Sequence, residues 1–203
     1  MKLITCVAIA IMLFAVSVQA AEVPTSAGDK AMVFMFHGLD DLAVSGYGHD
    51  YGFGMRYYLS DGMALRGGVL FGMSTYTDES VDPESEISMT SFGVEAVYEM
   101  HMEGPCASVS PYFGVGGNFD SYTEEWDNYE GYETAEISET GFGIFGTGGF
   151  EWGFTDCMTL GGEYRLGFMS MSTETTIEGD VCCEESGTWM GFGTASAYLS
   201  VYW

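Results

Sequence analysis

The chain has 203 residues, and 30 acidic side chains against 5 basic ones give it a formal net charge of −25 at pH 7. This negative charge argues against nucleic acid as a partner, because affinity for a phosphate backbone comes from Lys and Arg. Glycine supplies 29 residues, about twice the average usage of ~7%, and aromatic side chains reach 15%. Such a composition weakens helices, and the chain after residue 20 has no long apolar pattern with a 3.6-residue period. We therefore predict an all-β protein.

Residues 1–20 have the layout of a secretory signal peptide. Lys2 precedes an apolar stretch, and Val18 and Ala20 occupy the positions that the signal peptidase recognises. The alternative is an uncleaved helical anchor, which needs about 20 apolar residues, more than this stretch offers. We expect removal of residues 1–20, which leaves a single domain over residues 21–203.

Eight segments of this domain are predicted to form β-strands, because apolar side chains occupy every second position in them. In the second segment, for example, the odd positions are mostly aromatic or aliphatic, while the even positions carry glycine, Asp50 and Arg56. The alternation is least clear in the first segment. In chain order the segments are 30–37, 47–59, 63–74, 87–102, 109–122, 138–154, 158–171 and a closing stretch from Trp189 to Trp203.

The connections between these segments alternate in length, as in outer-membrane barrels with short periplasmic turns and longer extracellular loops. An even number of strands also returns both ends of the domain to the periplasmic side. We predict an eight-stranded antiparallel up-and-down transmembrane β-barrel in the bacterial outer membrane. The short connections are residues 60–62, 103–108 and 155–157, and the long ones lie near 76–86, 122–137 and 172–187.

Charge placement distinguishes this barrel from a soluble barrel of the lipocalin kind, which has an apolar interior and an exterior that meets water. Seven charged side chains fall on the glycine-rich, polar face of their segments, and none of the seven falls on the apolar face. A soluble barrel with this pattern would be inside out, whereas Arg or Lys facing lipid at the bilayer centre costs about 2–4 kcal/mol. The seven residues are Arg56, Arg66, Glu95, Glu99, Glu151, Glu163 and Arg165.

These seven charges lie at similar depths, between the short turns and the middle of the barrel. We therefore predict one connected ion-pair network in the periplasmic half of the lumen. An eight-stranded barrel has an interior just wide enough to be filled by side chains, and an unpaired buried charge there costs about 3–5 kcal/mol. We interpret the network as a structural plug. The alternative is a gate that opens when the ion pairs exchange partners.

Several segments resemble the small outer-membrane β-barrel proteins of the OmpA/OmpX type. The resemblance spans nearly the whole domain and implies a fold and a location rather than an activity. The closing strand, apolar at alternate positions and ending on an aromatic residue, is similar to the signal recognised by the barrel-assembly machinery. The segments are MRYYLSDGMALRGG at 55–68, PYFGVGG at 111–117, LGGEYR at 160–165 and YLSVYW at 198–203.

The sequence offers no grouping suited to catalysis. A G-x-G-x-x-G pattern at residues 141–146 lies inside a predicted strand rather than between a strand and a helix, so it is a chance match. His37, His49 and His101 are too dispersed on this topology to form a ligand set, and no Ser, His and carboxylate gather at one rim. We predict no enzymatic activity, no cofactor and no metal ligands that can be named.

Four cysteines remain after removal of residues 1–20. Cys106 and Cys157 fall in short turns of neighbouring hairpins, where an oxidising compartment permits a disulfide between them. A bond from either to Cys182 or Cys183, in the last extracellular loop, would cross the membrane thickness, which disulfide geometry forbids. For Cys182 and Cys183 a strained vicinal bond, an intermolecular bond and a metal site stay open.

Each of the three long loops carries a cluster of Asp and Glu side chains. They form a solvated anionic surface, or alternatively bind divalent cations that bridge to lipid phosphates, because hard cations favour oxygen ligands. Trp126, Tyr129 and Tyr132 in the middle loop add aromatic contacts for a surface receptor. We predict a structural or surface-interaction role, with a narrow, cation-preferring, porin-like channel as the alternative.

Overall fold

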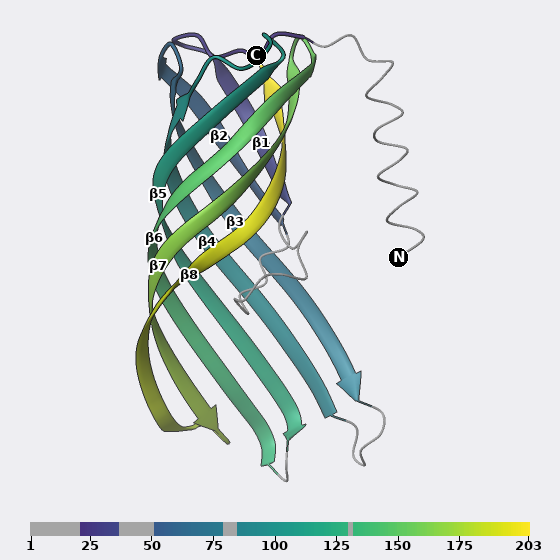
Figure 1. Cartoon of the computed structure of the whole chain (residues 1–203). Coiled ribbons are helices and arrows are strands. Elements are labelled where there is room, and N and C mark those ends of the chain that lie inside the picture. The colour runs from purple at the N-terminus through teal and green to yellow at the C-terminus, as the bar shows by residue number, and fades with distance from the viewer. Residues whose placement is uncertain (1–20, 37–50, 79–84, 130–131) are drawn as a thin grey trace.

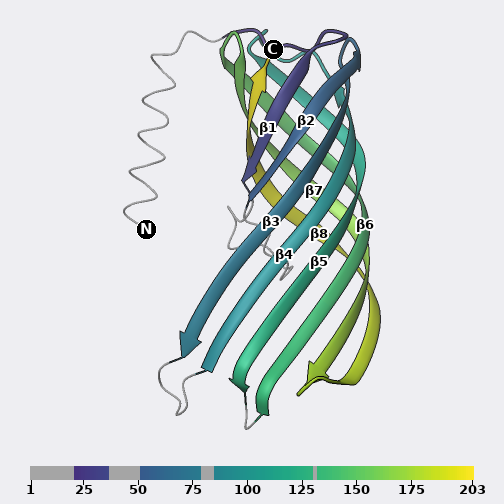
Figure 2. The same ribbon diagram turned by 180° about the vertical axis from the view of Figure 1, so that it is seen from behind.

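The computed structural model describes residues 21–36, 51–78, 85–129 and 132–203. They form one antiparallel sheet of eight strands, in which each strand pairs with the next and β8 pairs with β1 to close a barrel. Figures 1 and 2 show short turns and the C-terminus at one end, the short-turn end, and long hairpins at the other, the long-hairpin end. The strands are β1 Lys30–Phe36, β2 Tyr51–Ser60, β3 Met63–Asp78, β4 Ser85–His101, β5 Val109–Tyr129, β6 Tyr132–Thr155, β7 Met158–Ile177 and β8 Asp180–Tyr202.

The predicted all-β, antiparallel up-and-down architecture is confirmed, and each of the eight predicted segments overlaps one strand. Closure depends on a short pairing between β1 and β8, from Ala31 opposite Tyr202 to Phe36 opposite Ala197. Residues 1–20, His37, His49 and the beginning of the second predicted segment lie outside the described residues. Among the residues that are described, no helix is long and apolar enough to cross a membrane.

The long loops predicted near residues 122–137 and 172–187 are wrong in extent, because strand pairing continues through most of them. In the segment near 76–86 the pairing reaches Asp78 opposite Ser85, and residues 79–84 lie outside the described residues. The β7–β8 hairpin closes in two residues, Glu178 at φ 51° and Gly179 at φ 87°, and a tight hairpin turn of the I′ type requires such positive angles. Toward this end polar side chains occupy both faces, so the apolar alternation stops although backbone hydrogen bonding does not. The alternation therefore marked only the part of each strand that has an apolar face.

The two faces of the barrel differ sharply in polarity. Outward side chains in the barrel wall are large and apolar, with Met55 56% and Phe142 61% exposed, whereas the inward Arg56 and Glu99 are fully buried. In water this arrangement would leave a broad apolar belt unsatisfied, well beyond the patch that a soluble monomer normally exposes. The wall is therefore built to face lipid.

One register shift changes the predicted face of part of β8. Tyr164 pairs with Ala195 but Leu166 pairs with Phe192, so β8 contains an extra residue there. Because a one-residue shift exchanges the two faces of a strand, the alternation predicted from Trp189 through to Trp203 is interrupted. Met190, opposite Phe168, is the outward residue before the bulge and is 82% exposed.

Residues 21–29 run across the short-turn end of the barrel, where Figure 1 draws them in dark purple. The amide of Ala21 donates to the carbonyl oxygen of Gly153 at 3.0 Å, and that of Val23 donates to Ala107 at 3.1 Å. Farther along, the amide of Gly62 in the β2–β3 turn donates to the carbonyl oxygen of Thr25. This segment therefore ties three of the short connections together and buries Val23 against them.

Candidate functional site in the barrel lumen

The seven charged residues predicted to share the lumen come together in the structure. Arg56 on β2 lies directly opposite Arg66 on β3, and β4 places Glu95 and Glu99 on the same inner face. The other three project from β6 and β7. Inward glycines leave room for these long side chains: a Cβ on Gly161, for example, would overlap the ring of Tyr198.

The charges form an unbroken chain in which every guanidinium bridges two carboxylates. It runs Glu151, Arg56, Glu99, Arg66, Glu163, Arg165, Glu95, so Glu99 and Glu163 are the two carboxylates that join neighbouring arginines. Five of the six N–O distances between successive members are 2.6 Å, and the sixth, Arg66 Nε to Glu99 Oε1, is 3.0 Å. The five contacts at 2.6 Å are charge-assisted hydrogen bonds, whereas the contact of Arg66 Nε with Glu99 is an ion pair without hydrogen-bond geometry.

Hydroxyl groups and aromatic rings complete the environment of the charges. Glu151, at one end of the ion-pair chain, accepts hydrogen bonds from Thr159 at 2.7 Å and Ser200 at 3.0 Å. Tyr112 donates to Glu163 at 2.7 Å. The Tyr198 ring lies over the guanidinium groups of Arg56 and Arg66, and Arg165 Cζ lies 4.6 Å from the centre of the Phe145 ring. These partners stabilise most of the buried charges, whereas Nε and Nη1 of Arg66 make no hydrogen bond.

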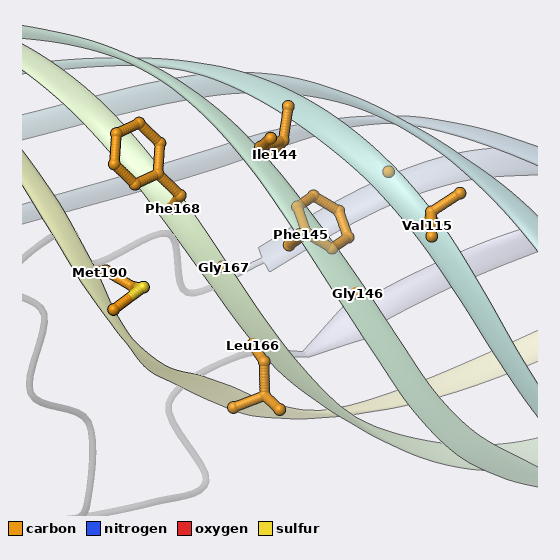
Figure 3. Close-up of a pocket in the computed structure, with 9 residues that line it drawn as sticks. Val115, Ile144, Phe145, Gly146, Leu166, Gly167, Phe168 and Met190 are labelled. Carbon is orange, nitrogen blue, oxygen red and sulfur yellow. The ribbon is translucent and has the colours of Figure 1, made fainter.

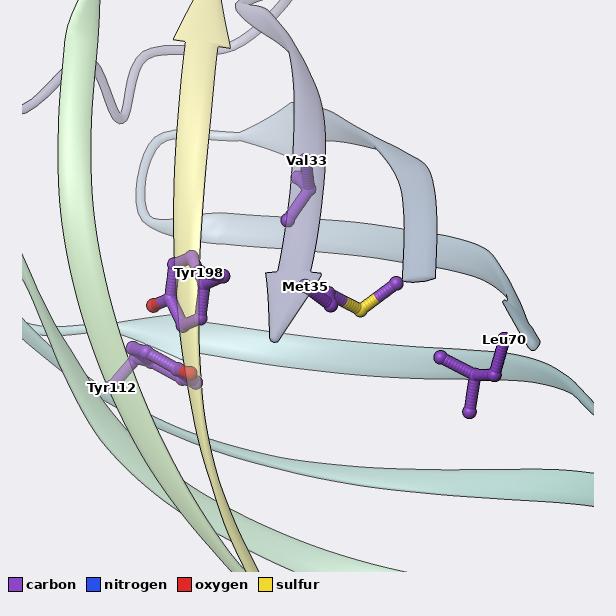
Figure 4. Packing of buried hydrophobic residues seen from close by; sticks show 5 residues of the cluster. All are labelled: Val33, Met35, Leu70, Tyr112 and Tyr198. Atoms are coloured by element: carbon purple, nitrogen blue, oxygen red, sulfur yellow. The ribbon is translucent and has the colours of Figure 1, made fainter. Parts of the chain in front are cut away.

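Two clusters of buried side chains pack against the ion-pair chain. Toward the short-turn end, Ala31, Tyr58, Ala64 and Tyr202 pack together. On the long-hairpin side, β1 and β3 contribute further apolar side chains to a second cluster (Figure 4). Burial among these side chains strengthens the interactions between the charges. The second cluster consists of Val33, Met35, Leu70, Tyr112 and Tyr198.

His101 is a member of this site that the sequence reasoning missed. Its Nε2 lies 3.5 Å from Glu99 and its Nδ1 lies 3.0 Å from the Ser110 hydroxyl and 3.9 Å from Glu151. The signal was present, because His101 is two residues from Glu99 and therefore on the same face of β4. Phe145 was also overlooked, because it is an apolar residue at a lumen position of β6, in a row of positions that is otherwise polar and glycine-rich.

The disulfide predicted between Cys106 and Cys157 is not formed in the structure, where both are free, exposed thiols. Each contacts a hydroxyl in its own turn, Cys106 with Ser108 at 3.2 Å and Cys157 with Thr155 at 3.7 Å. The Ala21 to Val23 stretch hydrogen-bonds both to Gly153 and to Ala107, so it lies between the two turns. Nor do the described residues contain a group of three or more His, Cys, Asp or Glu side chains able to hold a metal ion.

A family model, the outer membrane protein beta-barrel domain, matches residues 6–183. The chain belongs to this family. Membership agrees with the apolar outer wall and the buried charges of the barrel. It confirms the predicted location in the bacterial outer membrane. A comparison with curated protein sequences finds no significant match.

Solved structures similar to this outer-membrane barrel come from several bacteria. A major outer membrane protein from Thermus thermophilus aligns over 84% of this chain and 99% of that chain, at 12% identity and a TM-score of 0.52. Ail, the attachment invasion locus protein of Yersinia pestis, aligns over 85% and 99%, at 12% identity and a TM-score of 0.46. Outer membrane protein W of E. coli aligns over 86% and 99%, at 11% identity and a TM-score of 0.45. At such identities the likeness to the Thermus protein concerns the fold alone.

The wall of the outer-membrane barrel also carries an apolar pocket of about 770 Å³ over β5 to β8 (Figure 3). Its rim is formed by outward side chains, among them Val115, Ile144 and Leu166, and by Met190 beside the β8 bulge. Most of the lining therefore belongs to the lipid-facing side of the wall, and Phe145 adds to it from the lumen side. The G-x-G-x-x-G pattern at residues 141–146 lies within β6 in the same part of the wall, as expected for a chance match.

Proposed function

We propose that this protein is a non-enzymatic outer-membrane barrel with a closed lumen, which acts in envelope integrity or surface contact through its long hairpins. The contrast between the two parts of the molecule carries the proposal. A buried ion-pair chain occupies the lumen, while strands β3 to β8 extend beyond the short β1 and β2 toward the long-hairpin end. The charged side chains that a partner can reach are therefore concentrated on the hairpins.

The proposed orientation places the short-turn end in the periplasm and the hairpins outside the cell, as in other barrels of this architecture. In that orientation residues 21–29 cover the periplasmic mouth, and β8 ends there for recognition by the barrel-assembly machinery. The hairpins carry carboxylates such as Glu124, Glu136 and Glu174. Divalent cations that link these groups to lipid phosphates, or a cationic surface receptor, are the partners that this chemistry favours.

The β5–β6 hairpin offers a clean test of this role. Ser121 and Thr140 lie directly opposite each other, so residues 122–139 can be replaced by an Asn-Gly turn that joins the two strands in register. In the native host, the full-length protein should restore resistance to large antibiotics when the chromosomal copy is deleted, and the trimmed protein should not. A second variant keeps the hairpin length but replaces its carboxylates with amides, which separates the effect of charge from that of length.

A heat-modifiable shift on denaturing gels serves as the folding control for both variants. If the trimmed barrel folds and restores the envelope fully, the hairpin does not carry the function. Repeating the resistance assay with a chelator distinguishes the two kinds of partner. If the proteins with carboxylate and amide hairpins give the same resistance once the chelator is present, divalent cations are supported; if they still differ, a receptor is supported.

A cation-preferring channel is the second candidate, and the charge balance of the lumen favours it. Four carboxylates face three guanidiniums in the ion-pair chain. A conducting state would expose this excess negative charge to passing ions and attract cations. The channel hypothesis predicts that Glu95→Gln lowers the preference for cations, as measured by the reversal potential in a salt gradient. Unchanged selectivity in that variant would contradict it.

A further inference from the structure

The tip of the β7–β8 hairpin brings two thiols together. Cys182 and Cys183 are both exposed, and their sulfur atoms lie 3.4 Å apart. Neighbouring residues of a regular strand point to opposite faces, so adjacent cysteines would normally be separated. Here Cys183 pairs with Thr175 and Val181 pairs with Thr176, which leaves Cys182 as the extra residue of a β-bulge. The bulge accounts for the side-by-side thiols.

We propose that Cys182 and Cys183 form a binding site for a soft divalent metal cation of the Zn²⁺ and Cd²⁺ class. This site goes beyond the proposed function of the barrel, and its chemistry does not depend on the lumen. Thiolate sulfur is the preferred ligand of such ions. The two thiolates fill two coordination positions, and water or an exogenous ligand completes the shell.

The spacing of the sulfur atoms selects this class of ion. With zinc–sulfur bonds of about 2.3 Å, sulfurs 3.4 Å apart subtend roughly 95° at a zinc ion. A tetrahedral ion needs a separation of about 3.75 Å for the same bond length, which a small rotation of exposed side chains supplies. A linear two-coordinate ion would need about 4.6 Å at that bond length, more than 1 Å farther apart.

The same backbone disfavours a disulfide between the two thiols. Consecutive Cα atoms are about 3.8 Å apart across a trans peptide bond, which is below the range of about 4.4–6.8 Å that disulfides usually span. A ring closed by Cys182 and Cys183 would therefore be strained and easily reduced. Chelation of one metal atom between the two sulfurs avoids this strain.

The surroundings favour a cation and predict a pH dependence. Glu184 follows the thiols directly and pairs with Glu174 across the hairpin, so the local field is negative. Because a metal must displace the thiol protons, binding should tighten as the pH rises.

The test is a Cd²⁺ titration of the purified full-length barrel in detergent, followed by the charge-transfer absorption of cadmium thiolates. Excess Mg²⁺ occupies the surface carboxylates, which prefer hard cations. We expect one Cd²⁺ per barrel. Cys182→Ser and Cys183→Ser should each weaken binding by about 100-fold or more, the gain that two linked ligands provide over one. The matched control, Cys106→Ser with Cys157→Ser, removes the two exposed thiols of the opposite end and should leave the titration unchanged.

Three results would overturn the site. Retention of the wild-type affinity in Cys182→Ser would place the bound ion elsewhere. One Cd²⁺ per two barrels would mean that thiols of different molecules share the ion. Complete oxidation of the pair to an internal disulfide by a small-molecule disulfide, with release of two equivalents of its thiol and loss of Cd²⁺ binding, would make the pair a redox element instead.

Discussion

Replacement of Arg56 by methionine removes one link of the ion-pair chain at nearly constant volume. In the wild type Arg56 contacts Glu99 and Glu151, both at 2.6 Å, and all three side chains are fully buried. Glu99 keeps Arg66 as a partner, but Glu151 keeps only hydroxyl donors and His101 at 3.9 Å. Loss of one partner from a buried ion pair costs about 3–5 kcal/mol. We expect the folding equilibrium constant of Arg56→Met to fall roughly 100- to 4,000-fold.

Urea unfolding in lipid vesicles, followed by tryptophan fluorescence and by the gel shift, measures this change. The double variant Arg56→Met with Glu151→Gln removes the orphaned charge together with its partner. It should therefore be no less stable than Arg56→Met alone, and a double-mutant cycle gives the coupling between the two residues. A loss below about 0.5 kcal/mol in Arg56→Met, the scatter of neutral surface changes, would mean that water compensates Glu151 and that the lumen is not dry.

Three backbone predictions accompany it. Gly161→Ala should destabilise the barrel by about 1–3 kcal/mol in urea unfolding, because its Cβ would overlap the buried Tyr198 ring. The control is Gly148→Ala, which has no atom within 4 Å of the new Cβ and should be neutral or stabilise the barrel by up to about 1 kcal/mol. Gly62→Ala should destabilise by about 1–3 kcal/mol, because φ is +71° and the carbonyl oxygen of His101 lies 2.9 Å from the added Cβ. Asn tolerates the φ of 51° at position 178 better than Glu does, by about 0.5–1 kcal/mol. Glu178→Asn should therefore slow amide hydrogen exchange at the β7–β8 tip.

The sequence predicted the wall of the barrel well because lipid on one side and packed polar groups on the other enforce strict alternation. Beyond that zone polar side chains occur on both faces, and the pattern vanished while the strands continued. The segment near 172–187 was therefore predicted as a loop, although Glu178 and Gly179 are the only residues between β7 and β8. Within β8, a bulge near Phe192 reversed the faces, and a single extra residue leaves no periodic signal.

In the lumen, side-chain direction could be predicted but partner choice could not. The face and depth of Arg56 and Glu99 followed from strand position, and these two residues contact each other in the structure. Which carboxylate each arginine bridges depends on the shear of the closed barrel, which relates distant strands and is invisible in a single segment. His101 and Phe145 were missed because their residue types, rather than their positions, guided the search.

The closed lumen is tested most directly by the conductance of the purified full-length barrel in planar bilayers, with insertion verified by the gel shift of the same preparation. The buried ion-pair chain from Glu151 to Glu95, together with the side chains packed around it, predicts a baseline current without steady channel openings. Steady, ion-selective conductance that scales with the amount of inserted protein would contradict the closed lumen and make the channel the function of this barrel.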